Sequence, residues 1–190
     1  MVRLGPDFAG CAEQAGAAFG YEMPGTRYYD GRIWPVDDRS VDSVLATETL
    51  EHVLDPVQFL TEADRVLKPG GTLILTVPFA ARWHFIPRDF WRFTPSGLRE
   101  LLGARRFENI RICARGNEVT VACYKSIAIL ARFILPQNEL LLQRLVMRGI
   151  GLVVLPVFVA LRVAAQLSLR SGGGDDCLGY TVLAGKRTGD

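Results

Sequence analysis

The sequence predicts an α/β fold with a mostly parallel sheet. Residues 41–46 are short, mainly apolar and β-branched at several positions, and residues 72–77 are a continuous apolar run, which is the pattern of parallel strands covered on both faces. The segment between them has the spacing of an amphipathic helix, and strand, helix and strand with short joins form a right-handed parallel unit. A long apolar stretch of helical pattern, residues 119–169, precedes the last strand candidate. We therefore expect an apolar helical insertion before the final strand of the sheet.

The helix between the two strands has clear boundary signals. Asp55 suits the N-cap position and Pro56 the first helical position, while the Lys-Pro-Gly-Gly run of residues 68–71 is expected to end the helix. Helical spacing predicts a buried face and turns Glu62 and Arg65 toward solvent. That face comprises Val57, Leu60, Ala63, Asp64 and Leu67.

The remaining elements complete one core. Residues 95–105 can form a second helix, residues 108–114 a further strand and residues 178–185 the closing strand. A chain of 190 residues is long enough to bury such a core. We expect three parts: the α/β core over 1–118, the apolar helical insertion over 119–170, and a flexible loop with the closing strand over 171–190.

Composition and charge argue against several classes of protein. Because the four cysteines lack paired spacing and neighbouring histidines, we expect no disulfide framework, no metal site and a cytoplasmic protein. The N-terminus lacks the long apolar core of a signal peptide. Residues 1–98 carry 9 Lys/Arg against 13 Asp/Glu, whereas residues 99–170 carry 11 against 4. The basic excess coincides with the most apolar segment, which favours a membrane surface over nucleic acid as a partner.

Polar residues follow two neighbouring strands of the predicted sheet. Thr47, Glu48 and His52 come just after the first strand, and residues 79–93 just after the next. In open α/β sheets, ligands bind outside the carboxyl ends of the strands, so we expect these residues to face a crevice. His52 could react there or only cap and pack, and Glu51 is expected to be solvated on a first helical turn.

Several motifs occur in a fixed order along residues 20–112. They are Asp30-Gly31, Ile-Trp-Pro-Val at 33–36, an acidic run at 38–42, Glu51-His52-Val53, and Leu-Lys-Pro-Gly-Gly at 67–71. As an ordered series, with the closing residues 178–186, they resemble class I S-adenosylmethionine-dependent methyltransferases of the small type that includes ubiquinone- and menaquinone-pathway enzymes. The resemblance implies a Rossmann-like sheet, S-adenosylmethionine as cofactor and methyl transfer as activity.

The resemblance also implies roles for single residues. Asp30 and Gly31 match the loop that meets the adenine, although by themselves they could be only a turn. Ile33 matches the apolar residue that packs against the adenine face. Thr47 and Glu48 match a strand end beside the methionine part of the cofactor, and His52 matches a histidine near the reaction crevice. A sulfonium cation is compatible with nearby carboxylate oxygens.

The family's glycine-rich first loop is incomplete in this chain. Gly5, Asp7 and Gly10 stand where its glycines would fall, and Glu22 matches the acid that holds the ribose hydroxyls. Asp7 brings an anion to the place of the cofactor's carboxylate, and four residues before Gly5 are too few for a full first strand. We expect a sheet curtailed at its N-terminus and weak cofactor binding. The alternative function is a catalytically inactive binding or scaffold relative; a dinucleotide-binding redox domain is disfavoured by the later motifs.

The loop after the second strand matches a substrate-facing loop of the family through His84, Asp89, Phe90, Arg92 and Phe93. The last four are candidate contacts for a small-molecule or lipid-linked acceptor, and the alternative is a lid in which Asp89 and Arg92 pair structurally. His52 and His84 are candidate general bases, although alignment of the acceptor with the sulfonium could suffice. No spacing of residues indicates a metal site or a nucleophilic triad.

The apolar region over residues 127–169 has two readings. Its second part has 13 residues between Arg148 and Arg162, fewer than the about 20 that span a bilayer. We expect a buried core helix or a contact between two copies of the chain. The alternative is a helix lying in the membrane interface, which suits a lipid-linked acceptor and a membrane-associated cytoplasmic protein.

Overall fold

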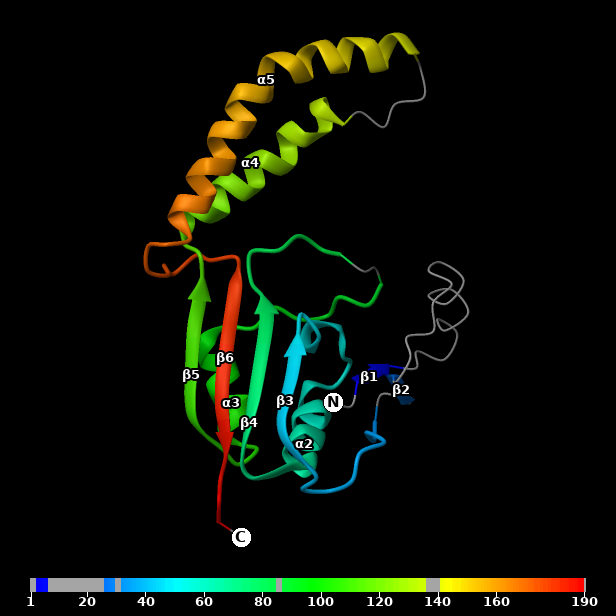
Figure 1. Ribbon diagram of the computed structural model, residues 1–190, viewed down its shortest axis with the longest axis vertical. Coiled ribbons are helices and arrows are strands. Elements are labelled where there is room, and N and C mark those ends of the chain that lie inside the picture. The colour runs from blue at the N-terminus through cyan, green and yellow to red at the C-terminus, as the bar shows by residue number, and fades with distance from the viewer. Residues whose placement is uncertain (1–2, 7–25, 30–31, 85–86, 136–140, 190) are drawn as a thin grey trace. The chain divides into compact units, whose positions relative to one another are not determined.

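The computed structural model describes residues 3–6, 26–29, 32–84, 87–135 and 141–189. Its main sheet has four strands in the order β3-β4-β6-β5. They are β3 (Val41–Thr47), β4 (Leu67–Pro78), β6 (Gly179–Lys186) and β5 (Phe107–Arg115). β3 and β4 are parallel, and Figure 1 shows β6 running opposite to its neighbours. The predicted α/β fold is confirmed, and its main sheet is mixed because β6 is antiparallel to β4 and β5.

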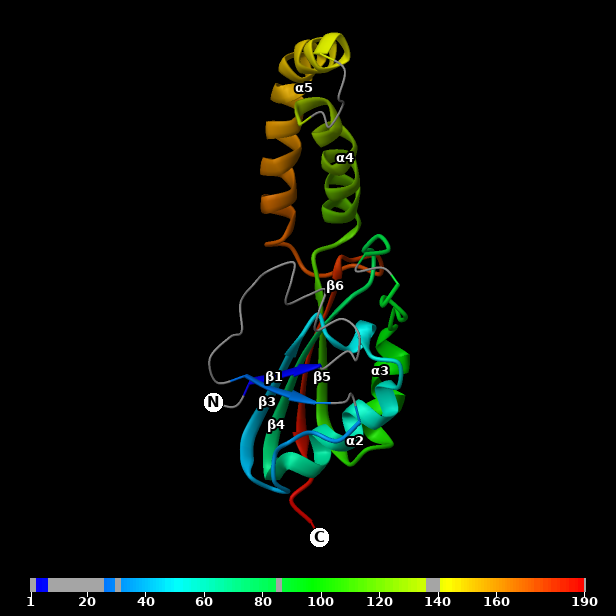
Figure 2. The same ribbon diagram turned by 90° about the vertical axis from the view of Figure 1, so that its right-hand side faces the viewer.

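The chain divides into two compact units. The first comprises residues 1–77, 83–111 and 182–190, and the second comprises residues 78–82 and 112–181. The first unit holds the short helix η1 (Leu50–His52), α2 (Pro56–Val66) and α3 (Pro95–Gly103). Figure 2 shows α2 and α3 on the same face of the sheet. The apolar side chains on this side are closed to solvent, including Leu60 of α2, Leu98 of α3 and Leu73 of β4.

A separate parallel pair, β1 (Arg3–Pro6) and β2 (Thr26–Tyr29), precedes the main sheet in sequence. The sequence pattern did not predict β2. Gly5 lies inside β1, where it pairs with Tyr28, so its predicted place in a loop after the strand was wrong. Asp7, Gly10, Glu22, Asp30 and Gly31 lie outside the described residues.

Helix α2 begins where the sequence predicted. The Asp55 side chain accepts a hydrogen bond from the Gln58 amide at 3.0 Å, and Pro56 takes the first helical position. The helix ends at Val66, just before residues 68–71, as predicted, but β4 already begins at Leu67 and not at the predicted Thr72. Pro69 disfavours a helical Lys68, and the buried Leu67 already pairs with Val41 of β3.

The predicted solvent face of α2 was wrong at Glu62. This side chain is buried, and it accepts hydrogen bonds from the Trp34 amide at 2.7 Å and from Arg65 Nε at 2.9 Å. Arg65 also donates to the Val36 carbonyl and to Asp38, at 2.9 and 2.5 Å. Burial would raise the pKa of Glu62, but the hydrogen bonds from Arg65 and Trp34 outweigh it and lower this pKa. Helical spacing could not reveal that the loop before β3 covers this side of the helix.

The prediction that β3 is covered on both faces was also wrong. Ala46 is buried, whereas the neighbouring Leu45 is 65% exposed. Successive residues of a strand point to opposite faces, so the described residues leave one face of β3 uncovered. An apolar run without alternation cannot distinguish this half-covered strand from a fully covered one.

The second unit contains the predicted apolar helices. α4 (Glu118–Ile134) and α5 (Leu141–Ser168) lie side by side, as Figures 1 and 2 show. Asn117 and Thr120 form a capping box at the start of α4. Thr120 Oγ1 lies 2.6 Å from Ser168 Oγ at the end of α5, which joins the two helices. A Cβ added to Gly151 would lie 2.6 Å from the Phe133 carbonyl oxygen, so the two backbones approach closely there.

Helix α5 is longer than the sequence suggested. Its segment Gly149–Ser168 has 20 residues and a mean hydropathy of 2.2, and only 6% of its most apolar window is buried. By length and composition this segment could cross a membrane, so the expectation of a segment limited to 13 residues was wrong. A single arginine, Arg162, does not interrupt a helix. Figure 1 shows a bend in α5, and the helix contains Pro156, whose missing N–H removes an intrahelical hydrogen bond.

Candidate functional site

The chain turns sharply where β3 ends. Glu48 has a φ of 47°, which is the left-handed region that a residue other than glycine rarely adopts. Its amide donates to the carbonyl oxygen and the hydroxyl oxygen of Thr76, at 2.9 and 3.0 Å, at the neighbouring end of β4. Thr49 Oγ1 donates to the Thr47 carbonyl at 2.9 Å. These hydrogen bonds hold the strained backbone of Glu48 in place at the end of the strand. Backbone strain of this kind is common in functional sites.

Glu51 was predicted to be solvated, and this prediction was wrong. The residue is 0% exposed, because residues 87–93 fold over η1 and the amides of Phe90 and Trp91 donate to the Glu51 carbonyl at 2.8 and 3.3 Å. Neither carboxylate oxygen of Glu51 has a hydrogen-bond partner among the described residues. The ring nitrogen Nε2 of His52 lies 3.5 Å from Oε1. Burial raises the pKa of Glu51.

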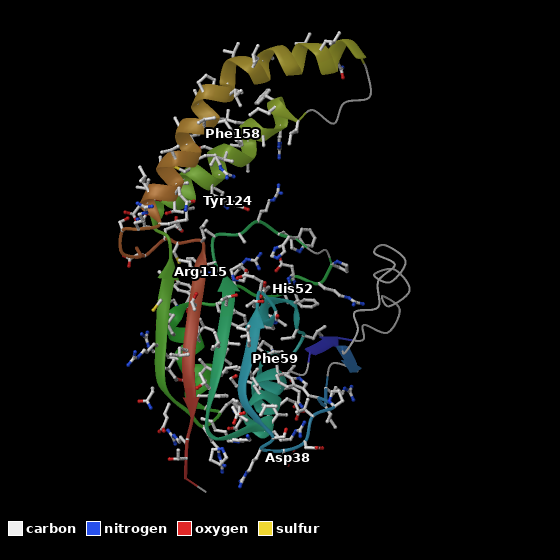
Figure 3. All side chains as sticks on the ribbon, in the orientation of Figure 1. Asp38, His52, Phe59, Arg115, Tyr124 and Phe158 are labelled. Atoms are coloured by element: carbon white, nitrogen blue, oxygen red, sulfur yellow. The ribbon has the colours of Figure 1, made fainter. Side chains whose placement is uncertain are left out.

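Both histidines of the chain lie beside this carboxylate. Figure 3 shows His52 near the carboxyl end of β3, with Asp38 near the opposite end. His52 Nδ1 lies 2.6 Å from the Arg88 carbonyl oxygen, so in the neutral ring Nδ1 carries the proton and Nε2 the lone pair. His84 Nδ1 lies 3.1 Å from the Asp89 carboxylate, which favours the same tautomer. The two rings meet edge to face, with centroids 5.0 Å apart.

Asp89 organises the loop that carries His84. Its side chain is 0% exposed and accepts hydrogen bonds from both terminal nitrogens of Arg92, at 2.5 and 2.7 Å. It also accepts from the His84 amide at 3.0 Å. The Arg92 hydrogen bonds hold the pKa of Asp89 well below its usual range. Trp91 Nε1 donates to the Val53 carbonyl at 2.9 Å, which ties the same loop to the residues after η1.

The structure brings part of the predicted site together. His52 and His84 share one cluster, and Thr47 and Glu48 stand at the adjoining strand end. Of the predicted acceptor contacts, Phe90 is exposed, Phe93 is buried, and Asp89 and Arg92 form the structural pair that the sequence left as an alternative. Ile33 is 67% exposed. Sequence reasoning missed Glu51 as a site residue, although its place directly before His52 at a strand end was a usable signal.

Comparison with known proteins identifies the first part of the chain. A match to the family described as methyltransferase domain covers residues 7–75. Residues 7–75 are therefore similar to this family. A protein of Mycolicibacterium smegmatis, named as a probable S-adenosylmethionine-dependent methyltransferase, is 38% identical over 74 residues, which are 39% of this chain and 28% of that protein. An uncharacterized 37.1 kDa protein in transposon TN4556 of Streptomyces fradiae is 48% identical over 56 residues, 30% of this chain and 15% of that protein.

This chain spans less than a third of the length of each of these curated relatives. Solved structures resemble it over most of its length. A SAM-dependent methyltransferase from Thermotoga maritima has a TM-score of 0.53 at 16% identity, covering 96% of this chain and 72% of that one. One from Archaeoglobus fulgidus has a TM-score of 0.51 at 17% identity, covering 96% and 75%. At these identities the likeness concerns the fold, and it confirms the Rossmann-like class.

Proposed function

We propose that this chain is an S-adenosylmethionine-dependent methyltransferase that acts on a small-molecule or lipid-linked acceptor. The observation that carries the proposal is the family match over residues 7–75, which ends in the strand that borders the polar cluster. The relative from Mycolicibacterium smegmatis supports the same cofactor through its name. When bound, S-adenosylmethionine supplies a methyl group on a sulfonium, which is an electrophile strong enough to react with an aligned acceptor.

The described residues fit this cofactor. The exposed Ile33 offers an apolar surface for an adenine ring, and an apolar wall is a usual component of such sites. Glu48 is held at the end of β3 by the two hydrogen bonds from its amide to Thr76, so its position is fixed before any ligand binds. We assign Thr47 and Glu48 to the methionine part of the cofactor. Gly5, Asp7, Glu22, Asp30 and Gly31 remain the proposed residues for the other parts.

On the acceptor side, we assign His52 and His84 the role of general bases. Each ring has its Nδ1 engaged, by the Arg88 carbonyl and by Asp89, so each presents Nε2 as the basic nitrogen. A base of this kind contributes by removing a proton from the acceptor during methyl transfer. Phe90, which is exposed on the same loop, is the proposed apolar contact of the acceptor.

Calorimetric titration with S-adenosylmethionine tests this proposal. We expect Glu48→Gln to weaken cofactor binding by about tenfold or more, because a charged hydrogen-bond acceptor is lost. Asp42→Asn is the matched control, since this exposed carboxylate lies near the other end of β3 and pairs with Lys68. Equal affinity of Glu48→Gln and the unchanged protein would contradict the assignment. Absence of any binding by the unchanged protein would support the inactive scaffold instead.

We further propose that α4 and α5 contact an anionic membrane surface, with a second copy of the chain as the alternative partner. The support is the exposed apolar surface of α5, which includes Leu152, Val153 and Val157. Co-sedimentation with anionic vesicles should fall as salt rises, and Leu152→Asp should reduce it. A chain that stays in the supernatant at low salt and sediments as a dimer without lipid would favour the second copy.

A further inference from the structure

Glu51, His52 and His84 form a compact group of metal-ligating side chains. Among the described residues, one ligand atom from each of the three lies within 4.8 Å of the others. Two imidazoles and one carboxylate are a ligand set that recurs in protein sites for divalent transition metals. Residue spacing did not indicate this group, because Glu51 and His52 are adjacent in sequence while His84 lies on the loop after the next strand.

The Glu51 carboxylate is buried without a hydrogen-bond donor among the described residues. A buried carboxylate without hydrogen bonds is costly, and buried charges are normally paired or bound to metals. Arg92 is attracted electrostatically to Glu51, but both of its terminal nitrogens form hydrogen bonds with Asp89. The negative charge of Glu51 is therefore best compensated by an ion that also contacts the two histidines.

The surroundings of the histidines match those of metal ligands. An imidazole that binds a metal through one nitrogen usually donates its other N–H to a carbonyl or a carboxylate. His52 has the Arg88 carbonyl oxygen 2.6 Å from Nδ1, and His84 has the Asp89 carboxylate 3.1 Å from Nδ1. Both arrangements orient the ring and leave the lone pair on Nε2, which in His52 is the nitrogen that faces Glu51.

We propose that Glu51, His52 and His84 bind one divalent transition-metal ion. Imidazole ligands favour ions such as Zn²⁺, Co²⁺ and Fe²⁺ over Mg²⁺ and Ca²⁺, which prefer sites made of oxygen atoms. Three protein ligands leave at least one coordination position open, as in catalytic metal sites. Resting on the proposed methyl transfer, we assign this open position to an oxygen atom of the acceptor, whose O–H a metal ion would acidify. In the metal-bound chain this effect replaces the general-base role of the two histidines, because their Nε2 lone pairs are then occupied; the general-base role applies to the metal-free chain.

Titration of the full chain, stripped of metal by a chelator, with Co²⁺ tests the site without cofactor or acceptor. We expect one Co²⁺ per chain, visible d–d absorption, and no thiolate charge-transfer band from the cysteines. Glu51→Gln, His52→Asn and His84→Asn should each weaken binding by at least about tenfold. Glu100→Gln, which changes an exposed carboxylate on α3, is the control and should bind Co²⁺ normally.

The chain has only two histidines, so imidazole nitrogen NMR gives a second readout. Added Zn²⁺ should shift the signals of both rings, and Mg²⁺ should shift neither. Wild-type affinity for Co²⁺ in folded Glu51→Gln, unchanged imidazole signals with Zn²⁺, or a thiolate band would each overturn the proposal. Thermal unfolding of each variant establishes that it is folded. Because neither measurement uses S-adenosylmethionine, failure of the metal site stays distinct from failure of the proposed methyl transfer.

Discussion

Replacing Asp89 by Asn should destabilise the first unit strongly. The Asp89 carboxylate is fully buried and accepts hydrogen bonds from Arg92 and from the His84 amide. Asparagine keeps the shape of the side chain but removes its charge, and its amide group turns a donor toward the donors of Arg92. The Arg92 guanidinium then remains partly buried without its counter-charge. The loop that positions His84 loses its internal anchor at the same time.

The magnitude follows from the burial of the pair. Removing one partner of a buried ion pair costs about 3–5 kcal/mol. Since the Arg92 side chain is 27% exposed, water can compensate part of this loss, and we expect about 3 kcal/mol. With a urea slope of about 2 kcal/mol per molar, the unfolding midpoint should fall by about 1.5 M. The expected loss of unfolding free energy is a large fraction of the stability of a typical domain.

Urea unfolding followed by tryptophan fluorescence measures the effect, since Trp91 is tied to the same loop through the Val53 carbonyl. Asp42→Asn is the matched control. Its carboxylate pairs with Lys68 at 2.8 Å but is 86% exposed, so its loss should cost less than about 1 kcal/mol. Adding Arg92→Met to Asp89→Asn should restore part of the stability, because no buried charge is then left alone.

Equal midpoints for Asp89→Asn and Asp42→Asn would refute the reasoning, because they would mean that burial does not distinguish the two ion pairs. Additive effects of Asp89→Asn and Arg92→Met would also contradict it. Either result would mean that the Asp89–Arg92 ion pair does not hold the His84 loop in place, and that these two side chains are available to contact a substrate.

Three further outcomes are expected. Because the folded pKa of Glu62 lies below its ordinary value, its contribution is present above about pH 4.5 and lost at lower pH; the difference in unfolding free energy between Glu62→Gln and the unchanged chain should therefore shrink as the solution is acidified. Gly151→Leu should separate α4 from α5 and lower the thermal unfolding temperature, because a Cβ there meets the Phe133 carbonyl; an unchanged temperature would show that this close approach is absent. Glu51→Gln should stabilise the metal-free chain by about 1 kcal/mol in urea, since it removes an uncompensated buried charge, and a loss of stability would contradict this account.

The sequence predicted the elements whose signals are local. Asp55 and Pro56 mark the start of α2 through the backbone groups of the first helical turn, which neighbouring residues satisfy. The order of strands and helices, and the motifs that resemble methyltransferases, are also properties of the chain alone. They were sufficient to predict the fold class and the similarity of residues 7–75 to the methyltransferase domain family.

Only the tertiary structure decided what each side chain contacts. Glu51 and Glu62 are charged residues at positions where the sequence pattern predicts solvent exposure. In the structure, residues 87–93 cover Glu51 and the loop before β3 covers Glu62. A helical period records which residues share a face, and it contains no information on which distant segment packs against that face. The proximity of His84 to His52 is likewise decided by the tertiary structure. Two parallel strands end at one edge of the sheet, and this brings together side chains that 31 intervening residues separate in sequence.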